Sequence, residues 1–456
     1  MASFTVNGLS SGIDYGAMID QLVAIKRIGV DNLNKSKDDS QTKLDVYGTL
    51  GTKLETLESA ADVLRKASTF AVKKADVGNA TIFTATASST ALAGNYIISD
   101  ITALAQSHKI AADGVADKDT TTVLSNGGTF QFTIDGTQTT ITATSDLTLE
   151  GLAAEINSSS GALTATIIND GDASNPYRLV LTSDTTGTTS AITIDNDTST
   201  LNMDVTITTL QVAQDASFRL DGLAITKSSN TVTDALEGVS FTLKNAAGIG
   251  NSYTLSVSND SDTIMANISA LIDGYNDVVS HIDTNSTYDT EANEGGPLFN
   301  EVTTRSIQRR MSTIITTGIT GLSSDTKILA QLGVKTNSDG TLTLNTTTLN
   351  DKLTTDFDDV MALFIDDTAT SIEGVGKQLY DVLHDINDFS VGAVTIRKKG
   401  IQDTIDIYTK DILVEEQRLV AYEEELKRRF GALEALLSTM SSQSNFLSNS
   451  LNNNNN

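Results

Sequence analysis

The sequence IQDTIDIYTKDILVEEQRLVAYEEELKRRFGALEALLSTM, residues 401–440, determines the architecture expected of this chain. Apolar side chains recur in it every three or four residues, with charged side chains between them, as in an amphipathic helix. At 1.5 Å per residue this helix is roughly 60 Å long. Because one exposed apolar stripe is marginal in water, the helix must pack against a partner. The stripe consists of Ile401, Ile405, Tyr408, Ile412, Leu419, Tyr422, Leu426, Phe430, Leu433, Leu437 and Met440.

The N-terminal region carries a similar stripe. Asp14 is placed to N-cap a helix, and Gly29 is expected to interrupt that helix. A second run from Leu44 to Leu64 steps by threes and fours. We therefore expect the N- and C-terminal helices to pack together in a coiled-coil-like seam, part of which faces other chains. The apolar residues of the N-terminal stripe are Met18, Ile19, Leu22, Val23, Ile25, Leu44, Tyr47, Leu50, Leu54, Leu57, Ala61 and Leu64.

The middle of the chain has a β composition. Residues 76–259 are rich in Thr, Ile, Val and Gly and alternate at period two. TFQFTIDGTQTTITAT (129–144) predicts a hairpin with Asp135-Gly136 in its turn, followed by a short helix from Leu149. SFRLDGLAIT (217–226) repeats the F-x-[IL]-D-G pattern, and helical spacing returns after Asp262.

These patterns predict an α+β multidomain fold. Terminal helices form a coiled-coil-like leg and a helical bundle, into which β-rich head domains are inserted. We expect flexible leg helices at 1–35 and 420–456, and a helical coiled-coil domain at 36–75 and 263–419. The proximal β head is expected at 76–108 and 213–262, and the distal β head at 109–212.

Composition restricts the class of function. The 456-residue chain has a formal charge of −27, so phosphate backbones and anionic lipid surfaces repel it, and neither nucleic acid nor a membrane is an expected partner. It has no cysteine, and hence no disulfide or thiolate metal site. No apolar run is long enough to span a bilayer, and the N-terminus lacks the features of a Sec signal peptide.

Candidate catalytic residues are few. Gly8-Leu9-Ser10-Ser11-Gly12 matches the G-x-S-x-G of serine hydrolases, but that motif normally follows several strands of a sheet. The glycines therefore indicate a flexible lead into the first helix. The three histidines, His108, His281 and His384, show no metal-ligand spacing. We expect no enzyme, no catalytic residue, no cofactor and no metal.

The C-terminal tail, MSSQSNFLSNSLNNNNN (440–456), contains three apolar residues among Ser and Asn. Phe446, Leu447 and Leu451 predict either a segment that folds into the groove of a partner or a disordered end.

Several stretches together resemble one known family. GLSSGIDYGAMIDQLVAIKR (8–27) resembles the start of the flagellar filament cap protein family (FliD, hook-associated protein 2). Residues 296–311 and 332–364 resemble the helical-domain blocks of this family, and 413–451 resembles its terminal coiled coil. Residues 130–193 are similar to a small insert found across flagellar axial proteins.

The resemblance implies a non-enzymatic protein that leaves the cell through the flagellar type III route without a cleaved signal. Its implied location is extracellular, at the tip of the flagellum. There it would form a homo-oligomeric ring, usually described as a pentamer, that retains flagellin and promotes its folding and insertion. The hook-filament junction protein and, before secretion, an export chaperone are further implied partners. Candidate filament or subunit contacts are Ile19, Leu22, Phe430, Leu433, Leu437, Phe446, Leu447 and Leu451.

Two other functions fit the same patterns. Another axial protein, either flagellin or a hook-filament junction protein, also pairs its terminal helices. A secreted adhesin would use the β heads for cell adhesion, through binding of host glycans.

Overall fold

The computed structural model describes residues 14–453 apart from residues 292, 323, 368 and 370; of residues 451–453 it describes the backbone only. It divides into a helical unit, Met1–Phe70 with Met265–Asn456, and a β-rich unit, Ala71–Ile264. The predicted fold class, long terminal helices with a β-rich middle, is confirmed.

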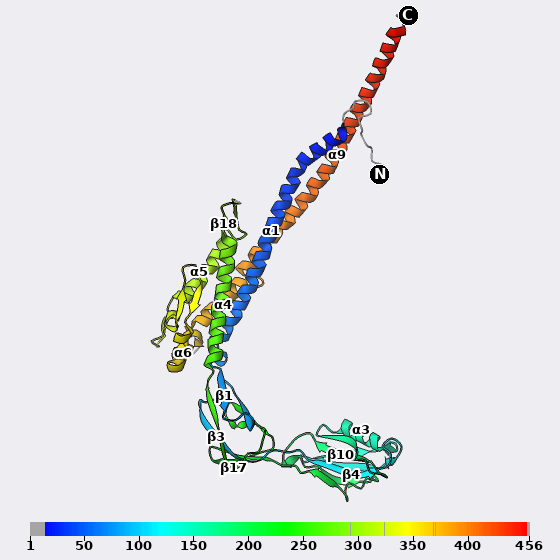
Figure 1. Cartoon of the computed structure of the whole chain (residues 1–456), viewed down its shortest axis with the longest axis vertical. Helices are drawn as coiled ribbons and strands as arrows, with labels where there is room; N and C mark the ends of the chain where they lie inside the picture. Colours follow the sequence, from blue (N-terminus) through cyan, green and yellow to red (C-terminus); the bar gives the residue numbers. More distant parts are fainter. Residues whose placement is uncertain (1–13, 292, 323, 368, 370, 454–456) are drawn as a thin grey trace. The chain divides into compact units, whose positions relative to one another are not determined.

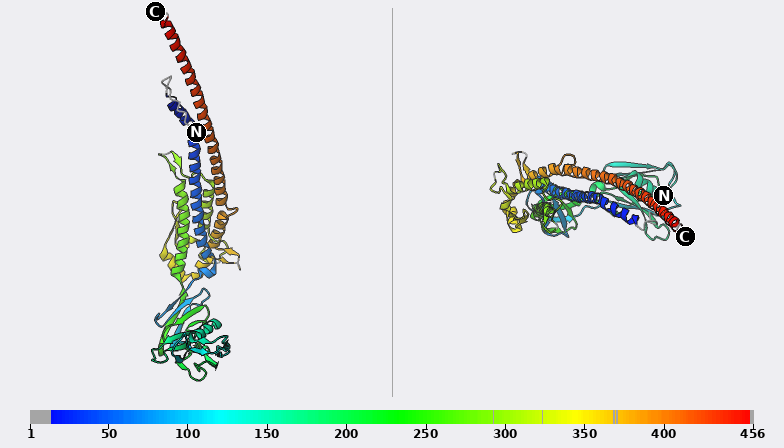
Figure 2. Two further views of the ribbon diagram at one scale, coloured as in Figure 1. Left: turned by 90° about the vertical axis from the view of Figure 1, so that its right-hand side faces the viewer. Right: turned by 90° about the horizontal axis from the view of Figure 1, so that it is seen from above.

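Two long antiparallel helices form the axis of the helical unit. Helix α1 (Tyr15–Arg65) and helix α9 (Ala393–Asn453) lie side by side in Figures 1 and 2. The Tyr15 and Phe430 rings are 5.2 Å apart at one end of the pair, and Val394 lies beside Gly51 at the other. Helices α4 (Ser261–Ser286) and α8 (Val375–Asn387) pack against α1. The expected packing of the two terminal helices is therefore present.

Burial is concentrated in one half of this unit. The core lies where α1 meets the shorter helices, and it thins toward the start of α1 and the end of α9. Among the described side chains of α9 beyond Leu426, none is buried. Core residues include Tyr47, Leu50, Leu54, Leu57 and Leu64 of α1, Ile268, Leu271, Tyr275 and Ile282 of α4, Leu379 and Leu383 of α8, and Val394, Ile401 and Ile405 of α9.

Helix α1 begins as predicted but is not interrupted. The Asp14 carboxylate accepts the Ala17 N–H at 3.0 Å, which confirms the predicted N-cap. The expected break at Gly29 is wrong, because α1 is continuous from Tyr15 to Arg65. A mid-helix glycine costs only about 1 kcal/mol, and the packing of a 51-residue helix outweighs that cost.

Shorter elements complete the helical unit. They are α2 (Ala67–Phe70), α5 (Val302–Thr316), the 3₁₀ turn η2 (Leu329–Leu332), α6 (Thr346–Thr355) and α7 (Phe357–Phe364). Helices α6 and α7 are separated at Asp356, whose φ of −133° ends α6. Three small hairpins pair β18 (Tyr288–Asp289) with β19 (Glu294–Gly295), β20 (Val334–Thr336) with β21 (Leu342–Leu344), and β22 (Asp366–Asp367) with β23 (Ile372–Glu373).

The β-rich unit holds two modules. In the proximal module a five-stranded sheet, β1-β17-β3-β13-β14, and a three-stranded sheet, β15-β16-β2, share a core around Phe83, Phe218 and Phe241. The strands are β1 (Lys73–Val77), β2 (Phe83–Ala87), β3 (Gly94–Ala103), β13 (Ala216–Leu220), β14 (Leu223–Lys227), β15 (Thr231–Leu236), β16 (Val239–Leu243) and β17 (Gly248–Asn259).

The distal module has its own core, around Phe130, Phe132 and Leu152. Its sheets are β12-β4-β10-β9, β11-β6-β7 and the pair β5-β8, and helix α3 (Leu149–Ser159) contributes its apolar face. The strands are β4 (Lys109–Val115), β5 (Thr122–Leu124), β6 (Thr129–Ile134), β7 (Thr137–Thr142), β8 (Leu147–Thr148), β9 (Leu163–Asn169), β10 (Tyr177–Ser183), β11 (Thr193–Asp197) and β12 (Thr208–Gln211).

Both predicted F-x-[IL]-D-G hairpins are confirmed. Asp135 and Gly136 turn β6 into β7 with φ of 49° and 71°, and Asp221 and Gly222 turn β13 into β14 with φ of 48° and 83°. Two successive positive φ values give a type I′ turn, which Asp-Gly adopts readily and which matches the twist of the strands.

Candidate functional site

The outer half of the α1–α9 pair is held by a few contacts across the seam. Arg27 Nη2 lies 2.9 Å from Glu416 Oε1, and the Lys26 amine lies 6.0 Å from the centre of the Tyr422 ring. Of the candidate contact residues, Ile19 is buried, whereas Leu22 and Phe430 are half-buried. These three side chains are thus largely engaged within the chain.

Beyond Phe430, helix α9 runs past the start of α1 (Figure 1). Among the candidates in this segment, Leu433, Phe446 and Leu447 are exposed and Leu437 is half-buried. Leu451 belongs to α9, but its side chain lies outside the described ones. The last part of α9 therefore presents apolar side chains to solvent.

Four exposed side chains share one face of this segment. Leu433, Leu436, Met440 and Leu447, which we call the terminal stripe, are each 41–59% exposed. Residues three, four and seven apart lie on the same side of a helix, so they form a coiled-coil-like seam without a partner in this chain. No charged residue occurs from Ala435 to Asn453. Leu436 and Met440 were not among the filament or subunit contacts expected from the sequence, although their coiled-coil-like spacing can be seen in it.

A polar cluster fixes the inner end of the α1–α9 pair. Glu301, immediately before α5, places its carboxylate between the two long helices. Its Oε1 lies 2.8 Å from Lys43 Nζ of α1 and 2.7 Å from Arg397 Nη2 of α9. Its Oε2 accepts the Tyr47 hydroxyl at 3.0 Å and Arg397 Nε at 3.1 Å. We call Lys43, Tyr47, Glu301 and Arg397 the Glu301 cluster.

Burial and these partners shift two pKa values in the Glu301 cluster. Burial alone would raise the pKa of Glu301, but hydrogen bonds from Arg397, Lys43 and Tyr47 and the nearby charges lower it from 4.5 to about 2. Burial, reinforced by the Glu301 charge, raises the pKa of Tyr47 from 10.0 to about 12. The folded chain therefore favours ionised Glu301 and neutral Tyr47.

These shifts make the stability of the helical unit depend on pH at both extremes. The Glu301 contribution is present above pH 4.5 and is lost as pH falls toward 2, whereas the Tyr47 contribution is present below pH 10 and is lost as pH rises toward 12. Denaturation followed by circular dichroism at 222 nm, across both ranges, measures this. Glu301→Gln is expected to flatten the acid limb and Tyr47→Phe the alkaline limb; unchanged limbs would contradict the assignment.

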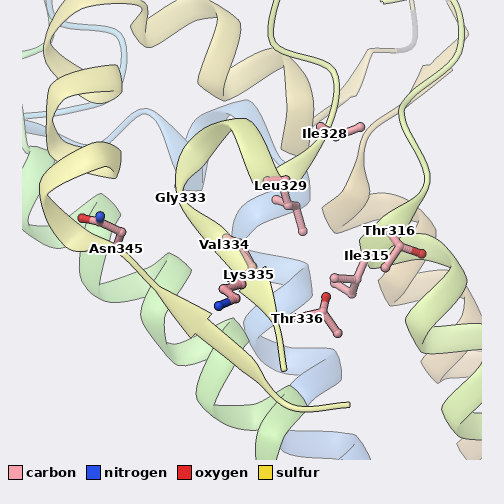
Figure 3. Close-up of a pocket in the computed structure, with 10 residues that line it drawn as sticks. Ile315, Thr316, Ile328, Leu329, Gly333, Val334, Lys335, Thr336 and Asn345 are labelled. Carbon is pink, nitrogen blue, oxygen red and sulfur yellow. The ribbon is translucent and has the colours of Figure 1, made fainter. Parts of the chain in front are cut away.

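A cavity of about 540 Å³ lies beside the end of α5. In Figure 3 Ile315 and Leu329 point into the space between α5 and β20, whereas Asn345 points away from it. The Asn345 side chain instead accepts the Thr348 N–H and caps α6. Lys335 is the one charged residue of the lining, so the cavity lacks the convergent polar groups that fix a small ligand.

The other sequence candidates for chemistry are dispersed. Ser10 and its glycines lie outside the described residues. His108 accepts the Ile192 N–H, His281 contacts the Val46 carbonyl and His384 contacts Glu58. Within 14–453, less the four undescribed positions, no three His, Cys, Asp or Glu side chains are grouped as metal ligands. In the same described part of the chain, no helix has the length and apolarity to cross a membrane.

The basic run Arg397-Lys398-Lys399 has a structural role at its first residue. Arg397 pairs with Glu301 of the same chain. Glu301 has the same structural role. The sequence did not identify it, because nothing in the local sequence indicates that Lys43 and Arg397 both bind its carboxylate.

Comparison with known proteins agrees with the geometry. The sequence profile described as "Flagellar hook-associated protein 2 C-terminus" matches residues 213–442, half of the chain, and the corresponding N-terminal profile matches residues 11–108. The "Flagellin hook IN motif" matches residues 129–185, within the distal module.

Whole-chain relatives and a solved structure point the same way. Flagellar hook-associated protein 2 of Escherichia coli K12 is 29% identical over the full length of both chains. The A-type protein of Pseudomonas aeruginosa is 26% identical over 98% of this chain and 97% of the relative. The crystal structure of the D1-D2-D3 domains of the Escherichia coli flagellar cap protein FliD matches with a TM-score of 0.66 and 28% identity, covering 78% of this chain and 99% of that one. The chain belongs to the flagellar hook-associated protein 2 family.

Proposed function

We propose that this protein caps the flagellar filament: it sits at the filament tip, prevents loss of flagellin, and promotes the folding and insertion of each new subunit. The family assignment and the likeness to a flagellar cap protein support this function. The observation that carries it in this chain is the terminal stripe, an apolar helical seam that this chain leaves uncovered.

The terminal stripe suits contact with other helices. Burying one Leu or Met side chain stabilises a contact by about 1.5–3 kcal/mol, so the stripe holds substantial binding free energy. A chain of charge −27 repels other acidic proteins, but its last helical segment carries no charge. A filament subunit can approach it there without that repulsion. We place the filament contact on this segment, together with Leu437, Phe446 and Leu451. Ile19, Leu22 and Phe430, which pack where α1 meets α9, would support this segment from within the chain.

The rest of the chain then takes the roles expected of a cap. Residues 1–35 and 420–456 form the legs, 36–75 and 263–419 the helical domain, and 76–262 the two β heads. Copies of the chain form a ring, a pentamer by the family resemblance, outside the cell at the flagellum tip. The chain reaches that place by the flagellar export route without a cleaved signal, after binding an export chaperone, and adjoins the hook-filament junction protein before filament growth begins.

Removal of the residues after Met440 tests this function. The truncated chain keeps both cores and is expected to stay folded and oligomeric, because the deleted part of α9 contains no buried side chain among those described. In a strain that lacks its own cap gene, it is expected not to restore filament growth, and unpolymerised flagellin should accumulate in the medium. Normal filaments from the truncated chain would contradict the role given to the tail.

A further inference from the structure

We propose that the exposed edge of strand β12 is a surface through which the distal module contacts a second copy of this chain. Strand β12 is an edge strand, because it pairs only with β4 in the order β12-β4-β10-β9. We define the β12 edge as residues 205–212, VTITTLQV. Its apolar side chains are exposed: Val205 by 78%, Ile207 by 43%, Leu210 by 52% and Val212 by 66%.

The opposite edge of the same sheet is closed by a side chain. Asn157 of α3 donates from Nδ2 to the Ala165 carbonyl at 2.9 Å and accepts the Ala165 N–H at 2.7 Å. This bidentate contact occupies the backbone N–H and C=O of Ala165, in the middle of the outer edge of β9, and so hinders another strand from adding there. The β9 edge of this sheet is thus partly blocked by a side chain, and we take the β12 edge as the open one.

Several other edge strands of the β-rich unit carry charges, although β2 and β7 do not. Strand β1 contains Lys74 and Asp76, β14 ends at Lys227, and β15 contains Asp234, which lies 2.7 Å from the Lys227 amine. Charged residues on an edge hinder edge-to-edge pairing. The β12 edge has none: the sequence from Val205 to Gln214 contains no charged residue.

The charge distribution favours a second copy of this chain as the partner that binds the β12 edge. Two chains of charge −27 repel each other, so they approach most easily where both surfaces are neutral. The β12 edge offers a strip of exposed apolar side chains on a strand whose only neighbour in its sheet is β4, and an exposed strand of a neighbouring distal module can add to it. Repeated head to tail with a rotation, such a contact closes a ring. The inference thus rests on the proposed cap function and names one contact of its oligomer.

The test is the oligomeric state of the full chain with a charged β12 edge. Ile207→Glu with Leu210→Glu puts two acidic side chains on the strip, and Ile168→Glu on β9, where Ile168 is 47% exposed, is the matched control on the closed edge. All three side chains are solvent-exposed, so circular dichroism and thermal melts should match the parent chain. Sedimentation velocity over a concentration series should show dissociation of the double variant, by about tenfold or more in Kd, while the control assembles like the parent.

Three results would overturn the inference: a monomeric parent chain, a double variant that assembles normally, or a control that dissociates equally. Filament growth is scored separately. A double variant that still assembles and caps would refute the β12 contact and leave the cap function intact. A parent chain that assembles through β12 yet does not restore filaments would refute the cap function and leave the contact intact.

Discussion

Replacing Glu301 by glutamine is expected to lower the free energy of unfolding of the helical unit by about 3 kcal/mol, the free energy that corresponds to its lowered pKa. The Glu301 side chain is only 11% exposed and binds Lys43 of α1 and Arg397 of α9. Glutamine keeps the shape but removes the charge, which leaves both cations and the Tyr47 hydroxyl without their anion. The helices α1, α5 and α9 therefore lose their common contact.

Urea denaturation followed at 222 nm measures this effect, because the long helices belong to the helical unit. Glu416→Gln is the matched control, since it removes the carboxylate of another α1–α9 ion pair. The Arg27 and Glu416 side chains are 54% and 40% exposed, so solvent screens their pair and Glu416→Gln should change the free energy of unfolding far less than Glu301→Gln. Hydrogen exchange should show faster opening around Lys43 and Arg397 in the Glu301 variant only. Equal losses in the two variants would refute the special role of the Glu301 cluster.

Substituting Leu433, Met440 and Leu447 together by serine is expected to abolish filament growth while leaving the fold unchanged. Each buried Leu or Met contributes about 1.5–3 kcal/mol to a contact, so losing three should weaken filament binding by roughly a thousandfold or more. Swimming, filament length and flagellin in the medium of a complemented deletion strain are the measurements.

A control on the same helix separates the terminal stripe from general surface polarity. Ile396 and Ile407 are 59% and 58% exposed on α9, but they lie beside the core of the helical unit. Ile396→Ser with Ile407→Ser should support normal filaments. If this pair stops growth as completely as the triple variant, or if the triple variant grows normal filaments, the terminal stripe is not the filament contact.

Features fixed by neighbouring residues were predictable from the sequence. Asp135-Gly136 and Asp221-Gly222 specify their turns because the dipeptide itself adopts the required positive φ values. The Asp14 cap and the apolar face of α3 depend on residues within one or two turns of helix. The predictions of these turns, of this cap and of this helix face were therefore correct in type and close in position.

Features fixed by distant contacts were not predictable. The continuity of α1 through Gly29 depends on packing against α9, which a local glycine signal does not report. The Glu301 cluster joins Lys43, Tyr47 and Arg397, which lie 96 to 258 positions from Glu301, so no spacing rule could assemble it. The apolar residues near the C-terminus were found from the sequence, but which of them remain exposed follows only from where α1 begins.

The antiparallel pairing of the two chain ends also fixes an order of folding. Arg27 and Glu416, which meet across α1 and α9, are separated by 389 positions, whereas the β-rich unit is one continuous segment, Ala71–Ile264. The β-rich unit can therefore fold from its own residues alone, but α1 stays without its partner until α9 is present. Contacts over such a separation form slowly. The helical unit is thus expected to complete its folding after the β-rich unit, with its apolar surfaces exposed for longer.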